Sequence, residues 1–197
     1  MTKPTTGTPP PVQPQMRADA RRNHRRLVNA AAAAFTEHGA EASLDDIARR
    51  AGLGSGTLYR HFPTRQALLE AVYLDQVQAM CAQAYELLNT EPPGDALATW
   101  LRGVVDYATM KRGLSELMHS LDKESAGFLW CRDALRAAGG ALLNRAQQAG
   151  AVRSDVTIVD LLRLLTAISK ATEPAPEAAD LLFAVVLDGL RNQQPAP

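Results

Sequence analysis

The sequence of 197 residues is poor in cysteine and contains no long apolar run. Cys81 and Cys131 are alone and far apart, so we expect each to be a buried thiol outside any disulfide, with redox sensing as the alternative. No run approaches the roughly 18 consecutive apolar residues of a membrane-spanning helix. The first residues also lack the apolar segment of a secretory signal, and we therefore expect a cytoplasmic protein without a membrane partner.

Patterns typical of catalysis and of metal binding are missing as well. The four histidines, His24, His38, His61 and His119, do not have the spacing of metal ligands, and there is no CxxC, P-loop, GxSxG or HExxH motif. The Gly-Ser-Gly segment at 54–56 lacks the lysine and the preceding strand of a phosphate-binding loop. The sequence therefore predicts that the protein is not an enzyme and holds no metal or cofactor.

Charge is balanced over the whole chain but not along it. Residues 1–65 contain ten Lys and Arg against five Asp and Glu, a net charge of +5, whereas residues 66–197 contain eleven against sixteen, a net charge of −5. A basic segment attached to an acidic one is typical of a DNA-binding head on a body that avoids DNA.

The start of the chain combines proline with arginine. Residues 1–16 include five prolines and few apolar side chains, which predicts a disordered tail. Five arginines follow, at the approach to a helix expected over 21–38: Arg17, Arg21, Arg22, Arg25 and Arg26. Because positive charge is unfavourable at a helix N-terminus, these side chains indicate contacts with DNA phosphates or a minor groove. A solvated helix start is the alternative.

Residues 43–62 are the most informative segment. Apolar residues recur with the spacing of a short amphipathic helix at Leu44, Ile47, Ala48 and Ala51. Ser43 is suited to cap this helix, Asp46 completes a weak capping box, and Gly52 is suited to end it. A second short helix is expected over 57–62. Leu58 and Phe62 lie on its buried face, and Pro63 ends it.

Two short helices joined by a glycine-containing turn form a helix-turn-helix, whose second helix can enter a DNA major groove. The alternative is an ordinary pair of antiparallel helices. The polar side chains of the second helix favour DNA, because they are hydroxyls, an arginine, a histidine and a tyrosine rather than a mixture of Glu and Lys.

The segment A-G-L-G-S-G-T-L-Y-R-H-F-P-T-R-Q-A-L-L-E-A-V, at 51–72, resembles the signature of TetR-family transcriptional repressors. The segments A-A-A-A-F-T-E-H-G and S-L-D-D-I-A are similar to that family's first helix and the entry to its second, so the resemblance covers about 21–72. Two positions depart from it: Gly54 stands where relatives usually cap the recognition helix with Ser or Thr, and Ser55 stands where Lys is frequent.

The predicted DNA-binding residues are Ser43, Ser55, Gly56, Thr57, Tyr59, Arg60, His61, Thr64 and Arg65. Arg60 is suited to guanine and Thr57 to a base edge or a thymine methyl. Tyr59 and His61 resemble the phosphate-contacting pair of the family. Ser43, Thr64 and Arg65 would hold phosphates at helix starts.

The remainder of the chain predicts helices only, over 64–89, 95–112, 114–121, 125–149, 157–170 and 176–192. With the three helices before them, these give an all-α protein of about nine helices. The expected organisation is a disordered Pro-rich tail over 1–16, a helix-turn-helix DNA-binding domain over 17–65, a helical ligand-binding and dimerisation domain over 66–192, and a C-terminal tail over 193–197.

The last two predicted helices are more apolar than a monomer core requires. We therefore expect them to form a four-helix dimer interface with a second copy, with completion of the monomer core as the alternative. The residues chosen for the interface are Leu161, Leu165, Leu182, Val185 and Val186. A dimer would present two recognition helices to an inverted repeat.

Bulky side chains between 100 and 131 predict a pocket for a small, largely apolar ligand, although a plain core would have the same composition. The residues expected to line it are Trp100, Tyr107, Met110, Leu117, Met118, His119, Phe128 and Cys131. The resemblance to TetR regulators implies that a small inducer binds in this region, and we expect a homodimeric repressor. Our hypothesis is that the ligand shifts 114–121 against the helix over 64–89 and so releases the DNA. The alternative is an all-α scaffold or adaptor without small-molecule sensing.

Overall fold

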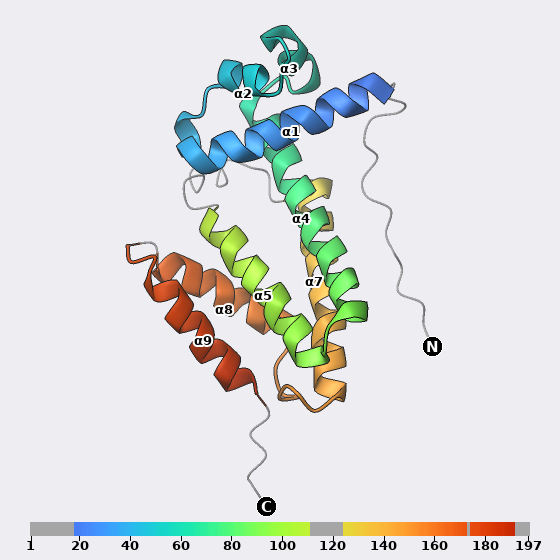
Figure 1. Cartoon of the computed structure of the whole chain (residues 1–197), viewed down its shortest axis with the longest axis vertical. Coiled ribbons are helices and arrows are strands. Elements are labelled where there is room, and N and C mark those ends of the chain that lie inside the picture. The colour runs from blue at the N-terminus through green and yellow to red at the C-terminus, as the bar shows by residue number, and fades with distance from the viewer. Residues whose placement is uncertain (1–17, 111–123, 173, 192–197) are drawn as a thin grey trace, which may run out of the picture. The chain divides into compact units, whose positions relative to one another are not determined.

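The computed structural model describes residues 18–110, 124–172 and 174–191, and only the backbone at 40 and 108–110. Within these ranges the regular elements are helical, which confirms the all-α prediction (Figure 1). The elements are α1 (Ala18–His38), the 3-10 turn η1 (Gly39–Glu41), α2 (Leu44–Arg50), α3 (Ser55–His61), α4 (Arg65–Thr90), α5 (Pro93–Met110), α7 (Ala126–Gln148), α8 (Ile158–Ala171) and α9 (Ala178–Leu190). The helix predicted over 114–121 and the tails predicted over 1–16 and 193–197 lie outside the described residues.

The described residues form two compact units, and α4 and α7 each contribute to both. Unit 1 comprises residues 18–75 and 124–132, and unit 2 comprises residues 76–110, 133–172 and 174–191. None of the helices in the described ranges combines the length and apolar character needed to cross a membrane.

Unit 1 is organised around α1, α2, α3 and the first part of α4. Apolar side chains from all four helices are at most 1% exposed: Leu27, Ala31, Phe35, Ile47, Ala48, Leu58, Leu68 and Leu69. The alanines of α1 allow close helix packing while favouring helix. The structure begins α1 at Ala18 rather than at the predicted Arg21, and Asp19 lies in its first turn, where a carboxylate is favourable.

Unit 2 is built from the remainder of α4 with α5, α8, α9 and most of α7. Its centre is Trp100, which is 0% exposed and donates its indole N–H to the Met80 carbonyl over 3.0 Å. Leu97, Leu101, Leu142, Leu161 and Leu165 belong to the same buried cluster. The core therefore joins residues from α5, α7 and α8 that lie far apart in the sequence.

Helix boundaries in unit 2 follow local chemistry. α5 begins at Pro93, two residues before the predicted Asp95, because proline is tolerated in the first turn of a helix. α8 begins with a capping box, in which the Thr157 side chain accepts from the Asp160 N–H and the Asp160 carboxylate accepts from the Thr157 N–H. α9 covers Ala178–Leu190 rather than the predicted 176–192.

Both cysteines are thiols in the structure. Cys131 is buried as predicted, whereas Cys81 is only half-buried. Burial raises the pKa of the Cys81 thiol, which disfavours the reactive thiolate.

Candidate DNA-binding site

The helix-turn-helix begins at the predicted cap of α2. The Ser43 hydroxyl accepts from the Asp46 N–H over 3.4 Å, which satisfies one of the amides at the helix start. The Asp46 carboxylate lies 2.6 Å from the Arg49 guanidinium, one turn further along α2. The Ser43 cap is therefore confirmed, and its hydroxyl holds the helix start.

The turn between α2 and α3 depends on Gly52, which has a φ of +63°. The Gly52 N–H donates to the Arg49 carbonyl and the Leu53 N–H donates to the Ala48 carbonyl, each over 2.9 Å. This is a Schellman motif, which requires a left-handed residue at this position and strongly favours glycine. The prediction that Gly52 ends the helix is confirmed.

α3 begins at Ser55, two residues before the predicted start, because Gly54 acts as its N-cap. Gly54 supplies no side-chain hydrogen bond to the first turn, as its lack of a side chain dictates. Leu58 is 0% exposed and Phe62 is 4% exposed, so this face of α3 belongs to the core of unit 1. The opposite face is left to the solvent.

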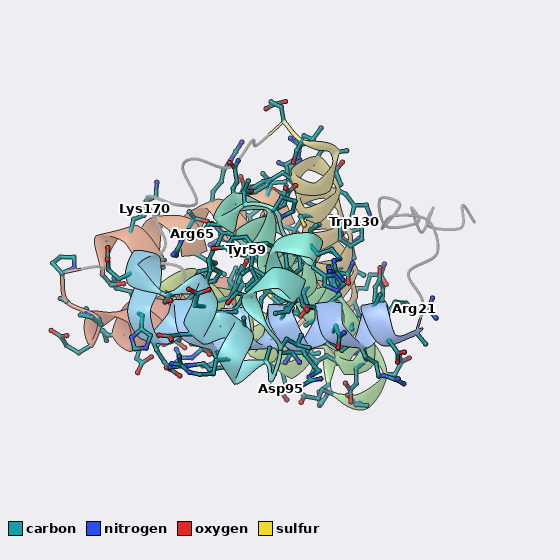
Figure 2. The ribbon with its side chains drawn as sticks, turned by 90° about the horizontal axis from the view of Figure 1, so that it is seen from above. Arg21, Tyr59, Arg65, Asp95, Trp130 and Lys170 are labelled. Atoms are coloured by element: carbon teal, nitrogen blue, oxygen red, sulfur yellow. The ribbon has the colours of Figure 1, made fainter. Side chains whose placement is uncertain are left out.

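The exposed face of α3 carries the side chains predicted to touch DNA. Tyr59, which Figure 2 labels, is 47% exposed. Arg60 is exposed, and Thr57, Ser55 and His61 are partly exposed. Neither Tyr59 nor Arg60 has an ion pair or a side-chain hydrogen bond within the described ranges. An added Cβ at Gly56 would meet no atom within 4 Å, so α3 is also sterically open at this position.

The first turn of α4 is occupied by contacts within unit 1. The Thr64 hydroxyl accepts from the Ala67 N–H over 3.1 Å and so caps α4 as predicted. Arg65 is half-buried, and its guanidinium donates to the Ala42 carbonyl over 2.6 Å. This contact holds the start of α4 against the segment before α2. The phosphate contact expected of Arg65 stays a prediction.

Some arginines of α1 contact other groups of unit 1, and others have no ion pair in the described ranges. Arg22 forms an ion pair with Asp19, and the Arg26 guanidinium lies 3.4 Å from the Gly52 carbonyl. Arg21 and Arg25 are exposed and form no ion pair with the described residues (Figure 2 labels Arg21). The phosphate contacts expected of the arginines of α1 stay a prediction, and Arg17 lies outside the described residues.

An unexpected pair of imidazoles joins α1 to the end of α3. The ring centroids of His24 and His61 are 6.2 Å apart in an edge-to-face arrangement, and the His24 ring is 4.9 Å from that of Phe62. Burial, followed by the charge of His61, lowers the pKa of His24, and Asp75 acts in the opposite direction. Sequence analysis missed His24, because no spacing rule connects residues 37 positions apart.

The residues predicted to line a pocket belong partly to unit 1, partly to unit 2 and partly to segments outside the described ranges. Trp100 is a core side chain of unit 2, and Tyr107 is half-buried in the same unit. In unit 1, Phe128 stacks on Tyr73 with ring centroids 4.4 Å apart, and Cys131 is 0% exposed. Leu117, Met118, His119 and the Met110 side chain lie outside the described residues, so the pocket stays a prediction.

Leu161 and Leu165 do not lie on the surface where we expected a second copy. They are 3% and 0% exposed in the single chain, because they pack into the core of unit 2. Val185 is 59% exposed, and Leu182 and Val186 are half-buried.

Among His, Cys, Asp and Glu in the described ranges, no group of three or more is arranged to hold a metal ion.

The helices α1, α2 and α3, with the outer face of α3 presented beyond a glycine turn, define a helix-turn-helix DNA-binding protein. A family model described as "Bacterial regulatory proteins, tetR family" matches residues 27–72. A second, described as "Transcriptional regulator SbtR-like, C-terminal domain", matches residues 92–192, about half of the chain. The chain belongs to the TetR family of transcriptional regulators, which bind DNA and are not enzymes.

Similar proteins extend over nearly the whole chain. The TetR transcriptional regulator SCO0520 from Streptomyces coelicolor is 37% identical, with a TM-score of 0.75, covering 87% of this chain and 99% of that one. A TetR transcription regulatory protein from Mycobacterium vanbaalenii is 38% identical, with a TM-score of 0.72, covering 90% and 99%. The "Uncharacterized HTH-type transcriptional regulator Mb2274c" of Mycobacterium bovis is 25% identical over 168 residues, 82% of this chain and 84% of the relative.

Proposed function

We propose that this chain is a homodimeric repressor that acts in the cytoplasm by binding an inverted-repeat operator through α3. The observation that carries the proposal is the outer face of α3, where Tyr59 and Arg60 are exposed and have no side-chain partner among the described residues, while Leu58 holds the helix to the core. Arg60 reads a base, guanine being the best geometric match for a guanidinium. Tyr59 and His61 bind phosphates, together with Arg21 and Arg25 of α1.

Dimer formation is supported by an apolar surface on the last two helices. Leu164 of α8 and Leu181 and Val185 of α9 are 44%, 68% and 59% exposed. Exposed apolar side chains gathered on two neighbouring helices favour an interface with a second copy. In a dimer, two α3 helices about 34–36 Å apart would read successive major grooves on one face of the DNA.

We further propose that a small, largely apolar effector binds to the body and releases the operator. Two observations support this proposal: the apolar and aromatic composition of residues 100–131, and the match of residues 92–192 to a C-terminal domain of transcriptional regulators. A panel of small aromatic compounds, screened by thermal shift, would find binders. Each binder is then expected to weaken operator binding at saturation, and equal operator affinity with and without every binder would refute the effector.

The test of DNA recognition is selection of bound duplexes from a random pool by the purified full chain, at two salt concentrations. We expect enrichment of one inverted repeat, with the sequence preference kept and the affinity lowered at the higher salt. Retention that falls smoothly with salt and enriches no sequence would contradict recognition by α3. Absence of any retention would favour the all-α scaffold without DNA binding.

A further inference from the structure

We infer that His24 is a positioning and proton-linked partner of His61, so that operator binding takes up protons at this pair of imidazoles and tightens as the pH falls. The inference rests on the proposed function, since it assumes that His61 contacts a DNA phosphate. It adds a residue of α1 that sequence analysis did not select, and it adds a dependence on pH that DNA binding by α3 does not itself require.

The geometry places the two rings in one cluster. His61 is at the last position of α3, and its ring meets that of His24 edge to face with 6.2 Å between centroids. The His24 ring also packs on Phe62, which is 4% exposed, at 4.9 Å. Packing on the buried Phe62 side chain therefore holds the His24 ring in position. From there the His24 ring limits the orientations that the neighbouring His61 ring can adopt.

The charges around the two rings determine how readily His24 takes up a proton. His24 faces His61 on α3 and Asp75 on α4, while Arg21 and Arg25 are on its own helix. Partial burial disfavours a proton on His24, and repulsion between two imidazolium charges adds to this effect, so the pKa of His24 is lowered in the unbound protein. Among the described residues, the carboxylate of Asp75 opposes these effects.

DNA changes this balance because a phosphate at His61 adds negative charge beside both rings. A charged imidazole donates a stronger hydrogen bond to phosphate than a neutral one. The bound state therefore holds more protons than the unbound state, and by linkage the affinity rises as the pH falls. The limit is tenfold per pH unit for each proton taken up, and a dimer contains two such pairs.

The test measures operator affinity of the full chain by fluorescence anisotropy from pH 8 to pH 6 at constant salt, with the duplex obtained by selection. His24→Phe keeps an aromatic ring on Phe62 but cannot bind a proton, so we expect near-normal affinity at pH 8 and a shallower dependence on pH. His38→Gln is the matched control, because His38 is an exposed histidine of α1 beside Glu37 and Arg50, away from this pair. It should keep the full dependence.

A pH profile of His24→Phe that is as steep as that of the original protein would overturn the inference, and so would an original protein without pH dependence. Specific binding in either case leaves the proposed function intact. Absence of specific binding at every pH would refute both. A measurement without DNA gives a second check: in His61→Gln the ring protons of His24, followed by NMR, should titrate at higher pH than in the original protein, and an unchanged midpoint would also contradict the pairing.

Discussion

The contact between Gly139 and Trp100 gives a quantitative test of the packing of unit 2. A Cβ at Gly139 would lie 2.5 Å from two ring atoms of Trp100 and 2.8 Å from the Ile158 side chain. The indole has little freedom to retreat, because it is 0% exposed and its N–H is bound to the Met80 carbonyl. Gly139→Ala must therefore displace either the indole or α7.

The expected loss of stability for Gly139→Ala is about 1–3 kcal/mol, typical of overpacking a well-filled core. Gly140→Ala is the matched control, since its Cβ would have only one neighbour, Ile158 at an ordinary 3.8 Å. Replacing a helical glycine by alanine without a clash stabilises by roughly 0.5–1 kcal/mol. The two single variants Gly139→Ala and Gly140→Ala, at adjacent positions of α7, should thus change stability in opposite directions.

Thermal unfolding followed by circular dichroism would measure the difference. For a chain of this length, 1 kcal/mol corresponds to a shift in melting temperature of about 2–4 °C. We expect Gly139→Ala to melt below the original protein and Gly140→Ala slightly above it. Equal melting temperatures for the two variants, or a more stable Gly139→Ala, would refute the reasoning about the indole.

Three further predictions address α3, the dimer and α8. Tyr59→Phe should weaken binding to the operator and to a scrambled duplex alike, by about 0.5–1.5 kcal/mol, because it removes a phosphate hydrogen bond; anisotropy titrations that show a loss on the operator alone would argue for base reading instead. Leu181→Glu should shift the chain from dimer to monomer in analytical ultracentrifugation. Tyr85→Glu is the control, at a residue of α4 that is 49% exposed, and should leave the dimer intact. A Leu181→Glu protein that stays dimeric would place the interface elsewhere. Thr157→Ala should cost about 1 kcal/mol by removing the cap of α8, with faster hydrogen exchange in its first turn, and unaltered exchange there would count against the capping box.

Local signals in the sequence were sufficient for the helix-turn-helix. Ser43, Gly52 and Thr64 act within a few residues of their own positions, as a cap, a left-handed turn and a second cap. The spacing of Leu58 and Phe62 likewise identified the buried face of α3. Such features depend on chain geometry over one or two turns, which periodicity and residue type report directly.

Contacts between distant segments could not be predicted in this way. Arg65 meets a carbonyl 23 residues away, and His24 meets a ring 37 residues away, so neither role has a signature in the sequence. We assigned Leu161 and Leu165 to an interface because residue type and spacing are the same for an apolar side chain that packs in its own core and for one that packs against a partner. Deciding between these requires the packed structure, in which both leucines are buried.

The most direct test of recognition by α3 is to repeat the selection of bound duplexes with Arg60→Ala. We expect that the inverted repeat is still selected but that one base pair in each half-site, related by symmetry, is no longer specified. Measured on duplexes that differ only at this base pair, discrimination should fall by about 1–3 kcal/mol. An Arg60→Ala protein that selects the same base at every position would contradict the claim that this side chain reads DNA.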